Sequence, residues 1–86
     1  MARYKIEISR TAEKQLKKLS KDDQKRVVAV ILDLAENPLP KGSRKLAGYE
    51  DVYRIRVGHF RILYSCAART LIVIVLKIGR RKDVYR

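Results

Sequence analysis

Cysteine and histidine are scarce in this chain, and their shortage excludes two kinds of structural cross-link. The one cysteine, Cys66, can form no disulfide within the chain, and one Cys with one His gives too few ligands for a Cys/His zinc site. This cysteine count agrees with a reducing compartment, and we interpret Cys66 as a strand residue. No metal or other cofactor is expected.

Long hydrophobic runs are also missing. The longest, Leu71 to Leu76, is far shorter than the roughly 18 residues that a membrane-spanning helix requires. The N-terminus lacks the apolar region of a signal peptide. We therefore expect a cytoplasmic protein with no membrane partner.

Basic side chains far outnumber acidic ones. The chain has 21 Lys and Arg against 9 Asp and Glu, a net charge of +12 over 86 residues. Such a charge favours an anionic partner: nucleic acid first, then an anionic membrane, then an acidic protein. Because so short a chain buries only about 60 to 65% of its unfolded surface, we expect a single domain over residues 1–86.

The first half of the chain has the pattern of a strand followed by two helices. Arg3 to Ile8 alternates between apolar and charged residues, which predicts a half-buried strand. Ser9 or Thr11 can cap a first helix whose apolar positions recur from Ala12 to Leu19.

A second helix is predicted to start at Ser20, where Asp23 completes the spacing of a capping box. Its end is predicted at Asn37-Pro38, because Asn accepts the left-handed conformation and Pro cannot continue a helix. The core between helices and sheet is expected to comprise Ile6, Leu16, Val27, Ile31, Leu34, Ile55, Ile62 and Tyr64.

The second half predicts three strands in succession, over residues 52–57, 60–66 and 70–77. Residues 39–51 are rich in turn formers and predict a loop, with a short extended piece near residues 45–47. Residues 71–76 lack alternation, so we place the last strand near the centre of the sheet. Residues 78–86 are expected to leave the sheet as a polar tail. The fold class is therefore α+β: an N-terminal strand and a helical hairpin packed on a mainly antiparallel four-stranded sheet, in the order β-α-α-β-β-β.

The first two of these strands place arginines on one face. With Gly58-His59 as a two-residue turn, Arg56 lies opposite Arg61 and Ile55 opposite Ile62. Like charges directly opposite each other destabilise a strand pair, so this face is expected to bind a polyanion. The alternative is a solvated outer face.

The segments Lys45-Leu46-Ala47-Gly48, Tyr53-Arg54-Ile55-Arg56-Val57-Gly58-His59-Phe60-Arg61-Ile62-Leu63-Tyr64 and Lys77-Ile78-Gly79-Arg80-Arg81-Lys82-Asp83-Val84-Tyr85 carry a family pattern. Over nearly its whole length the chain resembles the RelE/ParE superfamily of toxins from type II toxin-antitoxin systems, and its ending is nearest the RelE branch. This resemblance implies a metal-independent endoribonuclease that cleaves mRNA in the ribosomal A site by attack of a ribose 2′-hydroxyl on the adjacent phosphate. It also implies an acidic antitoxin partner.

The resemblance assigns roles to particular positions. Those expected to be catalytic are Arg54, Arg56, Arg61, Arg81 and Tyr85, and those expected to contact RNA are Lys45, Lys77, Arg80 and Lys82. Arginine suits charge stabilisation because its planar fork binds phosphate oxygens and stays charged, and a tyrosine ring can stack on a base.

The proton-transfer group is left open by the sequence. The superfamily often has His where Arg80 stands and Lys where Arg54 or Arg56 stands, and arginine is a poor base because its pKa lies above about 12. Histidine is the side-chain type that titrates near neutrality, but His59 is interpreted as a surface turn residue, and Glu50 and Asp83 are weaker candidates. Two other functions also stay open: a ParE-like inhibitor of DNA gyrase, and a nucleic-acid-binding module without catalysis.

Overall fold

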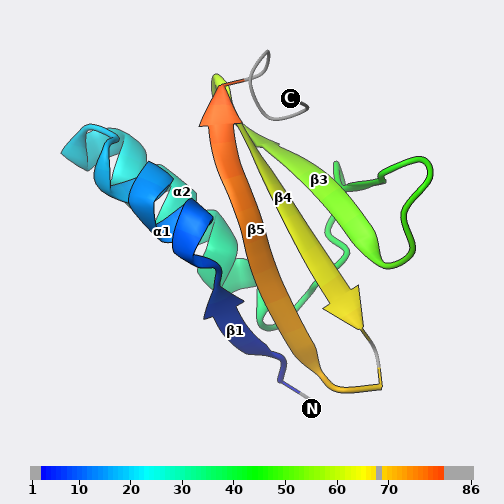
Figure 1. Cartoon of the computed structure of the whole chain (residues 1–86). Helices are drawn as coiled ribbons and strands as arrows, with labels where there is room; N and C mark the ends of the chain where they lie inside the picture. The colour runs from blue at the N-terminus through cyan, green and yellow to red at the C-terminus, as the bar shows by residue number, and fades with distance from the viewer. Residues whose placement is uncertain (1–2, 68, 81–86) are drawn as a thin grey trace.

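The computed structural model describes residues 3–67 and 69–80 (Figure 1). Its elements are β1 (Lys5–Ile8), α1 (Arg10–Lys17), α2 (Lys21–Leu34), β2 (Arg44–Lys45), β3 (Val52–Val57), β4 (Phe60–Ala67) and β5 (Ile72–Arg80). The strands form one sheet in the order β1-β5-β4-β3-β2, with β1 parallel to β5 and the other pairs antiparallel. The predicted α+β fold is confirmed, and the two-residue strand β2 adds a fifth strand to the four expected.

Serine caps start both helices. Ser9 Oγ accepts a hydrogen bond from the Ala12 N–H at 3.0 Å, and Ser20 Oγ accepts one from the Asp23 N–H at 3.2 Å. Each bond satisfies an N–H that a helix start leaves without an intrahelical partner. Of the two predicted caps for α1, Ser9 is the one used.

The predicted end of α2 is wrong in its detail. The helix ends at Leu34 and Ala35 stays right-handed, while Asn37 is absent from the described residues with positive φ. The chain instead leaves through a tightened turn in which the Glu36 and Asn37 N–H groups both donate to the Asp33 carbonyl, at 3.2 and 3.0 Å. These bonds occupy a carbonyl that a left-handed cap would otherwise serve.

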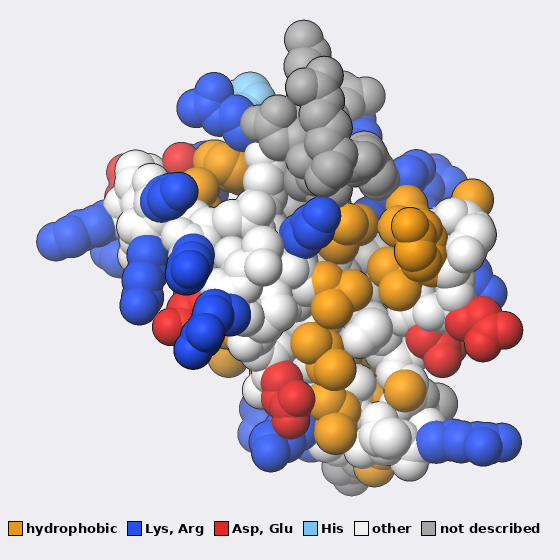
Figure 2. All heavy atoms as spheres, viewed as in Figure 1, with side chains coloured by type: hydrophobic (Ala, Val, Ile, Leu, Met, Phe, Trp, Pro, Cys, Tyr) orange, Lys and Arg blue, Asp and Glu red, His pale blue; other side chains and the backbone are white. Residues whose placement is uncertain are grey.

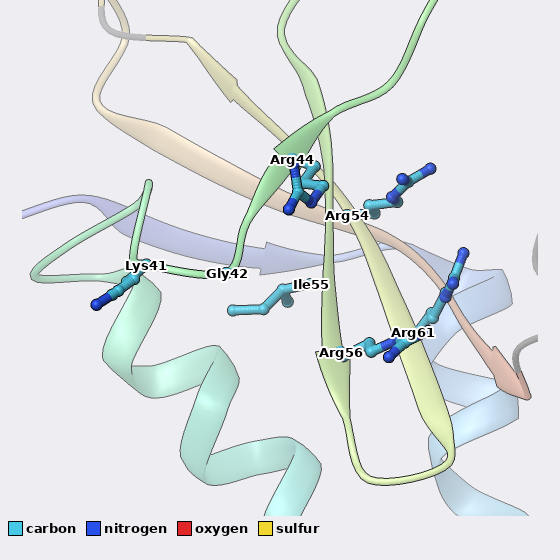
Figure 3. Close-up of a pocket in the computed structure, with 7 residues that line it drawn as sticks. All are labelled: Lys41, Gly42, Arg44, Arg54, Ile55, Arg56 and Arg61. Atoms are coloured by element: carbon cyan, nitrogen blue, oxygen red, sulfur yellow. The ribbon is translucent and has the colours of Figure 1, made fainter.

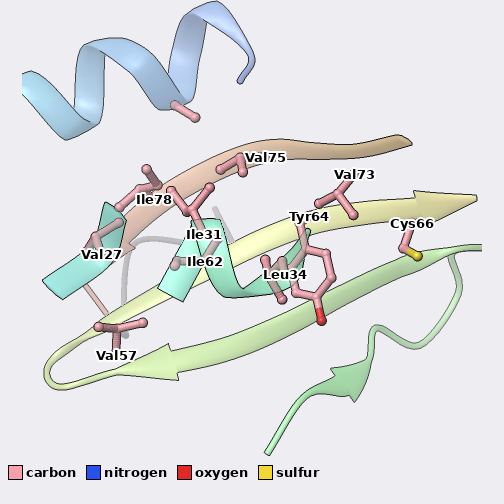
Figure 4. Close-up of a cluster of buried hydrophobic side chains, with 11 residues drawn as sticks. Val27, Ile31, Leu34, Val57, Ile62, Tyr64, Cys66, Val73, Val75 and Ile78 are labelled. Atoms are coloured by element: carbon pink, nitrogen blue, oxygen red, sulfur yellow. The ribbon is translucent and has the colours of Figure 1, made fainter. Parts of the chain in front are cut away.

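The helices cover one face of the sheet and enclose the core (Figure 4). Ile62, Tyr64 and Val75 are fully buried beneath Val27 and the rest of the apolar stripe of α2. The predicted core is confirmed: Val27, Ile31, Leu34, Ile62 and Tyr64 are buried, and Ile6, Leu16 and Ile55 pack against them. Cys66 is confirmed as a strand residue and is buried, and this burial raises the pKa of its thiol.

Tyr64 joins the core to the loop that precedes β2. Its hydroxyl donates a 2.8 Å hydrogen bond to the Pro38 carbonyl, and its ring stacks on Tyr53 with 5.9 Å between centroids. Burial raises the pKa of Tyr64 above the ordinary tyrosine value, although a hydrogen bond with Ser43 works in the opposite direction.

The hairpin between β3 and β4 has the predicted register, with Arg56 opposite Arg61 and Val57 opposite Phe60. Gly58 has φ +60°, whereas His59 is not among the described residues with positive φ. A positive φ at the first central residue alone is the geometry of a type II′ turn, which favours glycine at that position.

The end of β5 differs from the prediction. The strand runs to Arg80 instead of leaving the sheet after Lys77, and its register against β4 shifts between Leu63 and Tyr64. Leu63 pairs with Lys77 but Tyr64 pairs with Val75, so Leu76 is the extra residue of a β-bulge. The bulge returns Ile78 to the core, where it is 1% exposed.

Candidate nucleic-acid interface

The sheet face opposite the helices carries the arginines of the hairpin. Side chains alternate along a strand, so Arg54, Arg56 and Arg61 lie on the face opposite the buried Ile62. The strand pairings arrange this face in two cross-strand rows. The first contains Arg44, Arg54, Leu63 and Lys77, and the second contains Arg56, Arg61 and Gly79.

A hollow of about 490 Å³ lies on this face, and we call it the arginine hollow. Its lining consists of Lys41, Gly42, Arg44, Arg54, Ile55, Arg56 and Arg61, so every ionisable lining residue is Lys or Arg. In Figure 3, Arg54, Arg56 and Arg61 extend to one side of β3 while Ile55 points to the other. So many fixed positive charges on one concave surface suit a ligand with several negative charges.

The shortness of β2 shapes this hollow. Its two residues pair only with Tyr53 and Arg54, so the hollow continues around the edge of β3 beyond them. Gly42 has φ +100°, a conformation that L side chains rarely adopt, and it turns the chain between Lys41 and Arg44. Lys41 and Arg44 thereby add two positive charges to the three arginines of the hairpin.

A smaller hollow of about 120 Å³ lies at the hairpin turn. Arg56 and Arg61 line it together with Gly58, His59 and Phe60. His59 is exposed in the turn, as the sequence indicates, and it also borders the two arginines of the second row. Glu50 is exposed and lines neither hollow.

The structure brings some of the predicted site residues together and separates others. Arg54, Arg56 and Arg61 share the arginine hollow, and Lys77 lies in the row of Arg54. Lys45 pairs with Tyr53 and so belongs to the other side of the sheet, while Arg80 pairs with Phe60, outside both rows. Arg81, Lys82, Asp83 and Tyr85 lie outside the described residues.

Sequence reasoning missed Lys41 and Arg44 as lining residues. Their one signal is that they are basic residues in the turn-rich segment just before the hairpin. A two-residue strand is too short to show alternation, so the choice between Arg44 and its neighbour Lys45 depends on the pairing of β2 with β3.

The surface has an apolar zone beside these charges. Figure 2 shows a strip of hydrophobic side chains that runs lengthwise over the sheet, with Lys and Arg side chains over the helices on one side and further Lys and Arg side chains beyond the strip on the other. Ile72, Ile74 and Leu76 of β5 are half-buried on the described surface. This face therefore offers apolar contact next to positive charge.

Two further properties concern the described part of the chain alone. Within residues 3–67 and 69–80, no three His, Cys, Asp or Glu side chains come together as a metal site would require. Neither helix of that part is long and apolar enough to cross a membrane.

Comparisons of the sequence and of the fold with known proteins agree on one family. A model of the ParE toxin of type II toxin-antitoxin systems matches residues 6–85. The chain is 34% identical to a putative toxin RelE1 of Methanocaldococcus jannaschii, over 98% of this chain and 97% of that one. It is 31% identical to the toxin RelG of Mycobacterium tuberculosis, over 96% and 97%. The fold superposes on a chain of the archaeal RelE-RelB complex from Pyrococcus horikoshii with a TM-score of 0.83 and 28% identity, over 98% of this chain and all of the other.

Proposed function

Since this chain belongs to the ParE toxin family of type II toxin-antitoxin systems, on its RelE side, we propose that it is an endoribonuclease that cleaves mRNA in the ribosomal A site. The arginine hollow carries this proposal, because its ionisable residues are all cations on a face that the helices leave open. A strand of RNA presents one negative charge per nucleotide, which matches such a surface.

The proposed reaction is attack of a ribose 2′-oxygen on the neighbouring phosphorus. A P–O2′ bond forms and the P–O5′ bond breaks, so the 2′-hydroxyl loses a proton and the departing 5′-oxygen gains one. Negative charge accumulates on the equatorial phosphate oxygens in the transition state, where Arg61 counters it while Arg54 and Arg56 hold the flanking phosphates. Arg81 assists the leaving oxygen, and Tyr85 stacks on a base.

Proton transfer requires a group other than arginine, whose pKa is above about 12. Histidine is the side-chain type suited to this task near neutral pH. The location of His59 beside Arg56 and Arg61 supports it as the group that exchanges a proton with the RNA.

The proposed regulator is an acidic antitoxin. The P. horikoshii neighbour was solved as a RelE-RelB complex, and a Mycobacterium tuberculosis neighbour was solved as a toxin-antitoxin complex. A chain of net charge +12 is complementary to an acidic protein. Such an antitoxin would lie over the basic face and exclude RNA from it. We place both the RNA cleavage and its inhibition by the antitoxin in the cytoplasm.

The proposal is tested by adding the purified protein to translating ribosomes and mapping the 5′ ends of the mRNA. Cuts within the A-site codon, absent when Arg61 is replaced by Ala, are the expected result. Intact mRNA at saturating protein would overturn the proposal.

A second candidate, inhibition of DNA gyrase, is favoured by the matching family model, which is named for ParE. The same preparation incubated with gyrase and supercoiled DNA separates the two. Accumulated gyrase-cleaved DNA together with intact mRNA would support the ParE-like activity.

A further inference from the structure

The bulge in β5 is held by two polar side chains of the first helical segment. Ser9 Oγ donates a 2.8 Å hydrogen bond to the carbonyl of Leu76, the extra residue of the bulge. Gln15 Oε1 accepts a 2.7 Å hydrogen bond from the Ile78 N–H, two residues further on. A bulge leaves backbone groups without ladder partners. Ser9 pairs with a backbone group of the extra residue itself, and Gln15 pairs with one two residues beyond it.

The bulge decides which face receives each side chain at the end of β5. Val73 and Val75 point into the core before it, and strict alternation would then send residue 77 to the core as well. The extra residue reverses this order: Ile78 becomes the buried residue and Lys77 joins Arg54 across Leu63. It also places Gly79, which has no side chain, opposite Arg61.

We propose that Gln15 is a positioning residue for the RNA-binding face, because its bond to Ile78 fixes the bulge that places Lys77 in the cross-strand row of Arg54, on the far side of Leu63. This inference rests on the proposed function for the identity of the polyanion, which is single-stranded RNA. Gln15 touches no RNA itself. Gln15 acts through the backbone of β5. In this way a residue of α1 helps to position Lys77 on the sheet face opposite the helices.

Two observations separate this role from ordinary packing. Burial of Ile78 already favours the bulged register, so loss of the Gln15 acceptor should loosen the end of β5 without unfolding the protein. Gln24 provides a comparison on α2: its Nε2 donates to the Lys17 and Leu19 carbonyls at 3.4 and 3.0 Å, bonds confined to the helical hairpin. Removing them should affect stability but leave Lys77 in place.

The test measures how RNA affinity depends on salt, since each phosphate contact to single-stranded RNA contributes about 0.7 to the slope of log K against log salt. The variants are Gln15→Met, which keeps the side-chain length and removes the acceptor, Gln15→Glu, which retains an acceptor, Lys77→Gln, and the double variant Gln15→Met/Lys77→Gln. Gln24→Met is the matched control. A short RNA oligonucleotide serves as the probe, and the Ile78 amide exchange rate is followed by NMR.

We expect Gln15→Met and Lys77→Gln each to reduce the slope by one contact, and the double variant to reduce it no further than either alone. Gln15→Met should also raise exchange at Ile78 about tenfold or more, Gln15→Glu should restore both values, and Gln24→Met should change neither. A parent-like slope in Gln15→Met, or additive losses in the double variant, would overturn the proposal. Because binding and exchange need no cleavage, a parent protein that binds RNA without cutting it would reject the proposed enzyme activity and leave this test intact.

Discussion

Arg56 and Arg61 lie directly opposite each other on neighbouring strands, an arrangement that costs free energy in an isolated hairpin. A phosphate between the two guanidinium groups would remove that repulsion and gain planar, bidentate contacts. Under the proposed function, the strongest gain is expected where negative charge on the RNA is largest, in the transition state of cleavage.

The first prediction follows for Arg61. Arg61→Ala should lower the single-turnover cleavage rate of ribosome-bound mRNA by roughly 100-fold or more, the scale for loss of one preorganised charge-stabilising donor. Ribosome affinity, measured in parallel, should change far less. Arg26→Ala is the control, because it removes the same charge from an exposed position on α2. A rate that falls only in proportion to affinity would mean that Arg61 serves docking alone.

The second prediction compares two adjacent cations. Arg44 lines the arginine hollow and lies in the row of Arg54, whereas Lys45 pairs with Tyr53 on the other side. Arg44→Ala should weaken RNA binding about tenfold, which corresponds to about 1.4 kcal/mol, and Lys45→Ala should weaken it less than about threefold. Equal losses of RNA affinity in a filter-binding titration would show that the pairing of β2 does not place Arg44 and Lys45 on different faces of the sheet.

The sequence predicted on which face of the sheet the hairpin arginines lie, but it did not predict that Arg44 lies on the same face. Arg54, Arg56 and Arg61 follow from strand alternation plus a two-residue turn, both of which are local rules. Arg44 joins them through a pairing with β3 across a long loop. No local pattern encodes that contact, whereas Lys45 was assigned to RNA contact by the family resemblance.

Among the strands, β4 and β5 supply the fully buried side chains of the core, and Ile62 and Tyr64 are those of β4. Ile62→Ala should lower the free energy of unfolding by about 2 to 4 kcal/mol, because it removes buried methyl and methylene groups and leaves a cavity. Leu32→Ala, at a side chain 59% exposed on α2, should change it by less than about 0.5 kcal/mol. Urea denaturation of both variants checks this, and similar values for the two would contradict the assigned faces of β4.

Tyr64 gives β4 a pH-dependent share of the stability. Burial raises the pKa of Tyr64, so above the ordinary value of about 10 the unfolded chain loses this proton first. The contribution is therefore complete below pH of about 10 and declines as pH rises through the folded-state pKa.

Tyr64→Phe should cost about 1 kcal/mol at pH 7, through loss of the bond to Pro38. Its stability difference from the parent should then shrink in urea titrations carried out above pH 10. A difference that stays constant or grows with pH would refute this account. Comparing the two proteins at each pH cancels the titration of the other tyrosines and lysines.

The element order was predictable, while the bulge in β5 was not. Residues 71–76 are apolar at every position, so their pattern does not reveal which side chains face the core. The positions that face the core at the end of β5 depend on Ser9 and Gln15, which are distant in the sequence, and on the burial of Ile78. Residues 78–80 therefore belong to β5, although the sequence predicted that they leave the sheet.

For the whole molecule, charge governs encounters with partners. At +12, the chain should associate with an acidic antitoxin faster at low salt than at high salt, by roughly tenfold or more, because screening removes the steering. Stopped-flow association rates over a range of ionic strength measure this. The dissociation rate should vary much less, and flat association rates would exclude electrostatic steering.

Because β1 pairs in parallel with β5, the sheet can form fully only after β5 has been synthesised. Lys5 pairs with Ile72, and Ser9 bonds to Leu76 across 67 positions of the chain. Synthesis proceeds from the N-terminus, so a nascent chain exposes β1 and α1 long before their partner strand exists. The sheet closes over its longest separation, and Lys77 joins the row of Arg54 only after β5 has been synthesised. The arginines of the hairpin therefore exist in a growing chain before that row is complete.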